Sequence, residues 1–398
     1  MPQRHWPVKL IVSPFKKSSP NMLVYFLVMT TFFLSKRENS FLEYMRRYDR
    51  LGFQYLKKKG NLMLRLLICL TALFLSSKGF SVGPPVPMSQ AEFDSMMTEV
   101  SNWGRWGKED QLGTLNTITA QKRIEAAGLV TEGESVSLAL PLNTVSDQVN
   151  QKPFVHESFI FGGAEMEELG INSEDAAQAA GDVYKIDYHG FGHSHLDGIN
   201  HFAYKGKMYN GYPFDNQDGK GFMNLGIDKI GKVGVFTRGV LVDMPVFLGK
   251  KYMEPGNAIT IEDLEAWEKA SGITISAGDV LLVRTGRWHR VRDKGQWNFV
   301  QRAAGMHASV AKWLKERDVA AIGCDGVSDV MPSGVGARLN PLHELVIVGM
   351  GMPIFDNLDL DRLSMTARIK DRSTFLFVAA PLKVVGGTGS PLNPMAIF

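Results

Sequence analysis

Four histidines and one aspartate lie within the 13 residues from His189 to His201, and this cluster most constrains what the chain can fold into. The whole chain of 398 residues has only nine histidines, so their density here is itself informative. Polar side chains packed this closely cannot all be buried unless they share a partner. Imidazole and carboxylate groups together suit a borderline divalent ion such as zinc or manganese. The cluster therefore predicts a metal site, with candidate ligands His189, His193, His195 and Asp197.

The spacing within the cluster is compatible with two local structures. His193, His195 and Asp197 alternate, so on a strand they share one face and converge on one ion. In a tight loop, the intervening glycines let the backbone wrap around the ion instead. His201 follows Asp197 by four residues, which places it beside the ion. An imidazole that titrates near pH 6.5 suits a proton shuttle, and we expect this role for His201.

Charge is distributed unevenly along the chain. Residues 1–81 hold 14 Lys and Arg against three Asp and Glu, whereas the remaining residues hold 30 basic and 38 acidic side chains. An acidic body is a poor surface for phosphate groups. We therefore expect no nucleic-acid partner.

The basic N-terminal part contains two apolar runs, residues 22–34 and 66–75, which are both shorter than the ~20 residues of a membrane span. If translation begins at Met63, residues 63–81 resemble a signal peptide with a short basic start, an apolar core and small residues at cleavage spacing. Residues 1–62 are then an upstream extension or a mis-called start, residues 82–100 a linker, and the mature protein secreted or periplasmic. The alternative is a genuine N-terminal tail that associates with a membrane through its apolar segments. Cleavage would leave Cys324 as a single cysteine and exclude an internal disulfide.

After the linker, apolar runs alternate with helical patterns, which is typical of a single α/β domain over residues 101–398. We expect strands at 184–188, leading directly into the histidine cluster, and at 233–242, 279–284, 319–323 and 374–380. One helix begins after Thr260, where Asp263 completes a capping box, and ends at Gly272. Another helix spans 308–317.

Several segments together resemble one known family. The run from His189-Gly190 through Ser194-His195-Leu-Asp197-Gly-Ile-Asn-His201 resembles the H-x-G-T-H-x-D-x-P-x-H signature of the cyclase or kynurenine formamidase-like metal-dependent hydrolases. Further similar segments are Asn102-Trp-Gly-Arg-Trp-Gly107, Gly113-Thr-Leu-Asn116, Lys205-Gly-Lys-Met-Tyr-Asn-Gly211, Gly278-Asp-Val-Leu-Leu-Val-Arg-Thr-Gly286 and Gly386-Gly-Thr-Gly-Ser-Pro-Leu-Asn-Pro394. The resemblance runs from about residue 100 to the C-terminus.

This resemblance implies a swivelling β/β/α fold, a homo-oligomer, and one or two Zn²⁺ or Mn²⁺ ions. It assigns metal-binding roles to His195 and Asp197 and the catalytic role to His201. His343 and Asp356 resemble the elements that complete a second metal site.

The chain departs from the family pattern at three places. Phe191 stands where the family has its first histidine, so either His189 or His193 takes that role. Gly198-Ile199 replaces the usual Ala-Pro. Asp356 stands where a longer Glu is common, so one ion and two ions are both open.

Four other residues are candidates for substrate binding. Trp103 and Trp106 could stack on an aromatic substrate or belong to the core, and Tyr209 could line the site. Arg284 could bind a carboxylate through both of its terminal nitrogens, or form a structural ion pair.

The predicted function is the metal-dependent hydrolysis of a small amide, such as N-formylkynurenine or a cyclic amide. A divalent ion lowers the pKa of bound water to about 7, which supplies the nucleophile, and His201 moves the proton. One alternative is a metal-dependent cyclase or dehydratase, which is a lyase. The other is a secreted metal-binding protein without catalysis.

Overall fold

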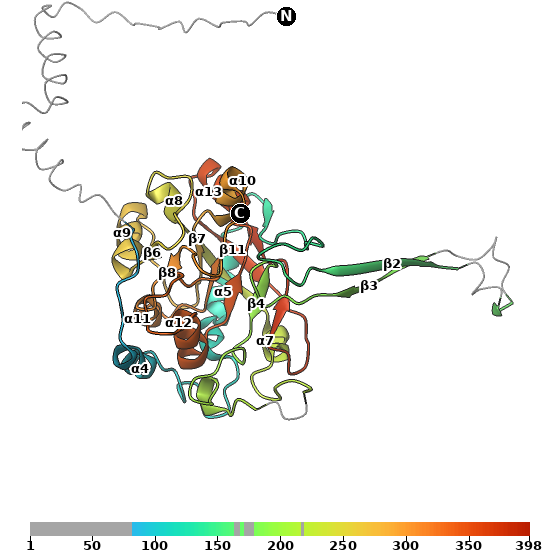
Figure 1. Cartoon of the computed structure of the whole chain (residues 1–398), viewed down its shortest axis with the longest axis horizontal. Coiled ribbons are helices and arrows are strands. Elements are labelled where there is room, and N and C mark those ends of the chain that lie inside the picture. Colours follow the sequence, from blue (N-terminus) through green and yellow to red (C-terminus); the bar gives the residue numbers. More distant parts are fainter. Residues whose placement is uncertain (1–81, 163–167, 171–178, 216–218) are drawn as a thin grey trace, which may run out of the picture. The chain divides into compact units, whose positions relative to one another are not determined.

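A mixed sheet of nine strands forms the centre of the residues that the computed structural model describes, which are 82–162, 168–170, 179–215 and 219–398 (Figure 1). The order across the sheet is β1 (Ser135–Ser137), β13 (Met395–Ile397), β11 (Thr374–Ala379), β5 (Val235–Asp243), β7 (Val280–Arg284), β9 (Ala321–Cys324), β10 (Ile354–Asp356), β4 (His195–Asp197) and β12 (Gly389–Pro391). The four neighbouring strands β5, β7, β9 and β10 run parallel, and the others pair antiparallel at both sides. Strands β6 (Ala258–Ile259) and β8 (Gly305–Met306) form a small separate pair.

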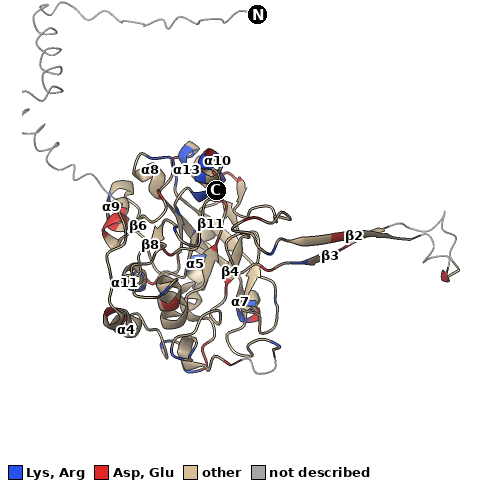
Figure 2. Cartoon of the chain, viewed as in Figure 1, with Lys and Arg blue, Asp and Glu red and all other residues tan. Residues whose placement is uncertain are grey.

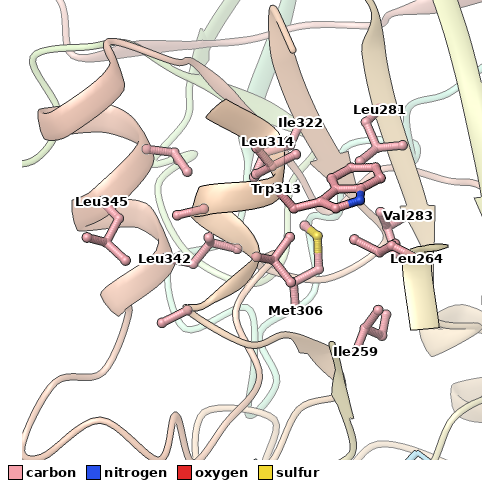
Figure 3. Packing of buried hydrophobic residues seen from close by; sticks show 14 of the residues in the cluster. Ile259, Leu264, Leu281, Val283, Met306, Trp313, Leu314, Ile322, Leu342 and Leu345 are labelled. Atoms are coloured by element: carbon pink, nitrogen blue, oxygen red, sulfur yellow. The ribbon is translucent and has the colours of Figure 1, made fainter. Parts of the chain in front are cut away.

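Both faces of the sheet are buried, which explains why its central strands are continuously apolar. Along β7, Leu281 and Val283 face one apolar cluster, whereas Val280 and Leu282 face another. Trp313 and Leu264 pack in the first cluster (Figure 3). A strand covered on both faces needs apolar residues at every position, and the 279–284 run of the sequence fits this rule.

Helices cover the sheet on its two faces and connect its strands. The α-helices are α4 (Gln90–Glu99), α5 (Ala120–Ala127), α7 (Ile227–Val233), α8 (Met244–Phe247), α9 (Ile261–Ser271), α10 (Arg287–Lys294), α11 (Val310–Glu316), α12 (Pro341–His343) and α13 (Asp361–Ile369). Residues of α9 and α11 belong to the first apolar cluster, and residues of α7 and α13 belong to the second. Short 3₁₀ turns are η1 (Gly113–Thr117) and η2 (Tyr209–Gly211), and η3 (Glu344–Met350) is π-helical.

Elements with local sequence signals form where they are predicted. The Thr260 side chain accepts the Asp263 backbone N–H, and the Asp263 side chain accepts the Thr260 backbone N–H, so the capping box of α9 is confirmed. Gly272 ends this helix with a φ of 69°, in the left-handed region that glycine adopts without strain. β5, β7, β9 and β11 lie within two residues of the predicted strands. The α/β fold class is likewise confirmed.

The linker predicted for residues 82–100 is wrong, because this segment belongs to the folded domain. Ser89 and Glu92 form a capping box that begins α4. Phe93, Met96 and Met97 of that helix are buried in the first apolar cluster. The prolines at 84, 85 and 87, which are typical of an extended linker, lie directly before this helix start. The signal peptide predicted at residues 63–81 and the extension at 1–62 lie outside the described residues.

The strand predicted at 184–188 is also wrong in its bounds. Among the described residues, β3 (Ala179–Lys185) ends before the histidines and pairs with β2 (Val155–Phe161), in a two-stranded arm that extends from the rest of the domain (Figure 1). Val155, Ile160, Val183 and Tyr184 of this arm are exposed. The chain then continues as a loop, whose carbonyl groups are bound by side chains and not by a neighbouring strand.

Basic side chains gather on α10 and α13, at one end of the domain (Figure 2). Asp361 of α13 pairs with Arg292 of α10, which joins the two helices, and also with Arg284 of β7 at 2.7 Å. Within the described part of the chain, no helix combines the length and the apolar composition that crossing a membrane requires.

Candidate metal centre

The centre is built on β4, a three-residue strand that lies between β10 and β12. His195, Leu196 and Asp197 of β4 are all buried. Antiparallel pairing places Asp356 of β10 directly opposite His195. The strand therefore brings residues that are more than 150 positions apart in sequence to one place.

A first group of candidate ligands consists of His189, His195 and Asp197. The Oδ1 atom of Asp197 lies 2.9 Å from Nδ1 of His189 and 3.3 Å from Nε2 of His195. The Nδ1 atom of His195 lies 2.8 Å from the His193 carbonyl oxygen, which leaves Nε2 to face Asp197. Thr388 holds the other nitrogen of His189, at 2.9 Å. Each histidine is thus fixed through one nitrogen while the second is directed at the aspartate.

A second group consists of Asp197, His343 and Asp356. Nε2 of His343 lies 3.3 Å from Oδ2 of Asp356 and 3.6 Å from Oδ2 of Asp197. His343 stands at the junction of α12 with the π-helical turn η3, a type of turn that is frequent at functional sites. Because Asp197 belongs to both groups, its two carboxylate oxygens face two adjacent candidate sites.

The donor set fits a divalent ion of the zinc or manganese type. Nδ1 of His189 and Oδ1 of Asp197 are buried and approach within 2.9 Å, yet neither makes a hydrogen bond with any described residue. Ligand atoms that share one zinc ion at about 2.0–2.2 Å lie at comparable distances from one another. Three imidazoles and two carboxylates form the mixture that these ions bind.

Neighbouring side chains keep Asp197 and His343 in their charged forms despite their burial. Burial alone would raise the pKa of the Asp197 carboxyl, but the neighbouring His201 and His195 hold it well below its usual range. Burial alone would lower the pKa of His343, but Asp356 and Asp329 hold it well above the ordinary histidine value. Asp197 is therefore a carboxylate that can bind a cation.

His201 lies beside the two groups. Its Nε2 atom is 3.9 Å from Oδ1 of Asp197, and its ring stacks on that of His189 with the centroids 3.8 Å apart and the planes 6° apart. Burial lowers the pKa of His201 to about 4, so the ring is neutral at pH 7 in the metal-free chain. This is the position expected of a proton shuttle.

His193 lies in neither group of candidate ligands, although the sequence predicted it as a possible metal ligand. The three-residue strand begins only at His195, so the alternation that would align His193 with His195 and Asp197 is absent. The His193 side chain is 3 % exposed, and neither ring nitrogen makes a hydrogen bond with a described residue. Burial lowers the pKa of His193, and the backbone of Lys152 opposes this shift. His189, and not His193, therefore belongs to the first group of candidate ligands.

The four candidates for substrate binding have partners inside the fold. The Trp103 indole donates to the Val348 carbonyl at 2.7 Å, and the Arg105 guanidinium lies 4.6 Å from the centre of the Trp106 ring. The Tyr209 hydroxyl is buried and donates to Asp110 at 2.9 Å. Arg284 pairs with Asp243 at 2.9 Å and with Asp361 at 2.7 Å, so the structural ion pair accounts for its guanidinium.

Sequence reasoning missed the carboxylate that orients His343. Oδ2 of Asp329 lies 2.5 Å from Nδ1 of His343, and its two oxygens accept the backbone N–H groups of Leu342 and His343. Carboxylates of this kind orient metal-binding histidines and fix their tautomer. No motif marked Asp329, because it follows β9 in an irregular segment.

Arg287 and Asn357 form a clamp on the loop that carries the histidines, and sequence reasoning missed this too. The Asn357 amide donates to the carbonyls of Gly190 at 2.7 Å and His193 at 3.2 Å. Arg287 donates to the Asn357 amide oxygen at 2.5 Å and to the Phe191 carbonyl at 2.6 Å. The clamp thus satisfies three carbonyls of a loop that has no strand partner.

Replacing Asn357 with alanine is expected to loosen this loop. The change removes the side-chain donor to the Gly190 and His193 carbonyls and the acceptor of Nη1 of Arg287, and it places alanine at a φ of 54°. We expect a loss of about 2–4 kcal/mol in the free energy of unfolding, measured with urea. Metal affinity, measured by competition with a chelator, is expected to fall about 10–100-fold.

Asn210→Ala is the matched control, because Asn210 also has a positive φ, of 59°, and binds loop carbonyls, in this case those of Gly107 and Lys108. This variant is expected to lose stability but to keep its metal affinity. Equal metal affinities in Asn357→Ala and the wild type would contradict the clamp.

Comparison with known proteins agrees with the fold. The sequence model of a family described as "Putative cyclase" matches residues 136–329. A crystal structure described as a novel cyclase is 28% identical, covers 75% of this chain and 100% of its own, and superposes with a TM-score of 0.66. No curated protein matches the chain in sequence.

Two further solved structures are more distant. Isatin hydrolase A from Ralstonia solanacearum is 24% identical over 70% of this chain and 97% of its own, with a TM-score of 0.47. A predicted metal-dependent hydrolase from Bacillus stearothermophilus is 16% identical over 66% of this chain and 98% of its own, with a TM-score of 0.41.

Proposed function

We propose that the chain is a metal-dependent hydrolase of small aryl amides, because residues 136–329 match the sequence model of the cyclase family and because one carboxylate joins its two groups of candidate ligands. N-formylkynurenine and cyclic amides fused to an aromatic ring represent the two substrate types. The observation that supports this proposal most strongly is that Asp197 belongs to both groups of candidate ligands and that a neutral histidine, His201, lies beside it. Zn²⁺ or Mn²⁺ is the proposed cofactor.

The residues of the chain divide the work between binding and proton transfer. His189, His195 and Asp197 would hold one ion, and His343 and Asp356 would hold a second ion together with Asp197. When bound, such an ion supplies an activated water and polarises the substrate carbonyl. Asp329 and Thr388 orient two of the histidines through their second nitrogens. Ser328 donates to Oδ1 of Asp356 at 3.3 Å and steadies that ligand.

His201 then carries the proton. Its neutral ring accepts a proton from the attacking water as the new C–O bond forms. It donates that proton to the amide nitrogen as the C–N bond breaks, so the products are a carboxylic acid and an amine. The stacked His189 ring keeps His201 in one orientation throughout.

The test is metal removal and reconstitution of the full-length chain. We expect the metal-free protein to be inactive on a panel of N-formylkynurenine, formanilide and isatin. Zn²⁺ or Mn²⁺ should restore hydrolysis, whereas Mg²⁺ should restore far less, because magnesium prefers oxygen ligands. Liquid chromatography with absorbance detection measures the products.

Oxygen-18 water separates hydrolysis from a lyase reaction. Hydrolysis places one solvent oxygen in the new carboxylate, whereas dehydration or ring closure does not. If metal binds but no substrate of the panel is hydrolysed, the proposed function is wrong.

A further inference from the structure

We propose that the β2–β3 arm of one copy of this chain docks on helix α13 of a second copy, so that two copies exchange arms in a two-fold dimer. The arm supplies apolar and acidic side chains, and α13 supplies two apolar side chains flanked by arginines. This inference concerns the assembly of the chain and does not rest on the proposed function. It names the two surfaces through which the chain associates with itself.

The β2–β3 arm exposes one apolar face. Its two strands form a sheet of their own, and a hairpin of two strands is only marginally stable in water unless another element covers it. Glu157 lies opposite Val183, and alternate residues of a strand share a face, so Val155 and Phe159 lie on the same face as Val183. These three apolar side chains are 47, 48 and 59 % exposed, respectively, in the order Val155, Phe159, Val183. Exposed apolar side chains grouped in this way mark a surface for a partner.

Helix α13 presents a surface of complementary character. Met365 and Ile369 lie about one turn apart on this helix and are 57 and 77 % exposed. Arg362 and Arg368 are exposed as well, and the four positions together occupy about one third of the helix circumference. Neither arginine forms an ion pair with a described residue. The face therefore offers two apolar side chains and two available positive charges.

Opposite charges favour α13 as the surface that receives the arm. From Glu157 to Asp182 the sequence has seven acidic side chains and no lysine or arginine. The basic side chains of α10 and α13 gather at one end of the domain (Figure 2). Complementary charges across an interface speed association and disfavour other partners.

A second copy of the chain is the partner that carries both surfaces. Within one copy, the arm extends from the domain and away from α13 (Figure 1). Two copies can each place an arm on the α13 of the other, which uses both surfaces twice. Such a reciprocal exchange closes a two-fold dimer, the commonest symmetric assembly of identical chains.

Sedimentation velocity of the full-length chain and of two single variants tests this inference. The wild type should be a dimer. Val183→Lys removes an apolar side chain of the arm and brings a positive charge towards the arginines of α13. Met365→Glu removes an apolar side chain of α13 and brings a negative charge towards the acidic arm. We expect each variant to raise the Kd of the dimer at least about tenfold, as the loss of an apolar anchor does at other interfaces.

An equal mixture of Val183→Lys and Met365→Glu distinguishes contact between the arm and α13 from contact between two arms. In the mixed dimer, one contact joins an unchanged arm to an unchanged α13. The other contact brings the introduced lysine and the introduced glutamate together, and their charges attract. The mixture should therefore dimerise more tightly than either variant alone.

Tyr184→Lys and Ile124→Glu are the matched controls. Tyr184 is exposed on the other face of the arm, where it lies opposite His156, and Ile124 is exposed on α5. Both variants should dimerise as the wild type does. A monomeric wild type would overturn the inference, and so would a dimer that either Val183→Lys or Met365→Glu leaves intact. A mixture no tighter than its parts, or equal weakening by a control, would overturn it too. None of these outcomes depends on the metal-dependent turnover that tests the proposed function.

Discussion

Asp197→Asn is expected to abolish metal binding at both groups and to lower turnover by about 10⁶-fold, the lower end of enzymatic rate enhancements. One oxygen of Asp197 faces His189 and His195 while the other faces His343, so the substitution removes a ligand from both groups. An amide has nearly the same shape but lacks the negative charge that attracts a cation. Metal content by mass spectrometry and the steady-state rate of amide hydrolysis measure the two effects.

Asp263→Asn is the control for this experiment. Asp263 is also buried, but it belongs to the capping box of α9 and lies in neither ligand group. Its variant should retain metal and activity. A thermal melt of metal-free Asp197→Asn shows whether the fold survives. If this variant is folded and still binds two equivalents of metal, the shared role of Asp197 is wrong.

His201→Ala is expected to keep the metal and to lose about 10²–10⁴-fold in kcat, the usual contribution of a general acid–base. The substitution leaves His189, His195 and Asp197 in place, because His201 lies outside both groups. Metal content and kcat, measured on the same preparation, separate binding from proton transfer.

The control for His201 is His156→Ala. His156 lies on the β2–β3 arm, where its partly exposed ring pairs with Asp182 at 2.5 Å. Its removal should leave kcat within about twofold of the wild type, since exposed ion pairs contribute little. Full activity in His201→Ala would show that another residue carries the proton.

Local signals in the sequence predict the elements whose causes are local. The helix from Thr260 to Gly272 is specified by its cap, its apolar face and its terminal glycine, all within 13 residues. The choice between His189 and His193 is different, because it depends on where the strand begins. The structure begins β4 at His195, and Asn357 and Arg287 hold the preceding loop so that His189 reaches Asp197. Two residues remote in sequence thus decide which histidine lies in the first group of candidate ligands.

The position of Asp356 likewise depends on contacts between residues that are distant in sequence. From sequence, an aspartate in place of the longer glutamate left the second site open. The structure pairs β10 with β4, so Asp356 stands opposite His195, and its shorter side chain still reaches 3.3 Å from His343. Sequence spacing between His343 and Asp356 carries no information about this pairing. Asp329 was missed for a related reason, since its role depends on the folded position of His343.

The place of β4 between β10 and β12 has a consequence for biosynthesis. β12 pairs antiparallel with β4, so that Gly389 lies opposite Asp197 and Pro391 lies opposite His195. Contacts between residues so distant in sequence form late, because a long stretch of chain must first be brought together. We therefore expect the centre to acquire metal only after β12 has been synthesised and has paired with β4.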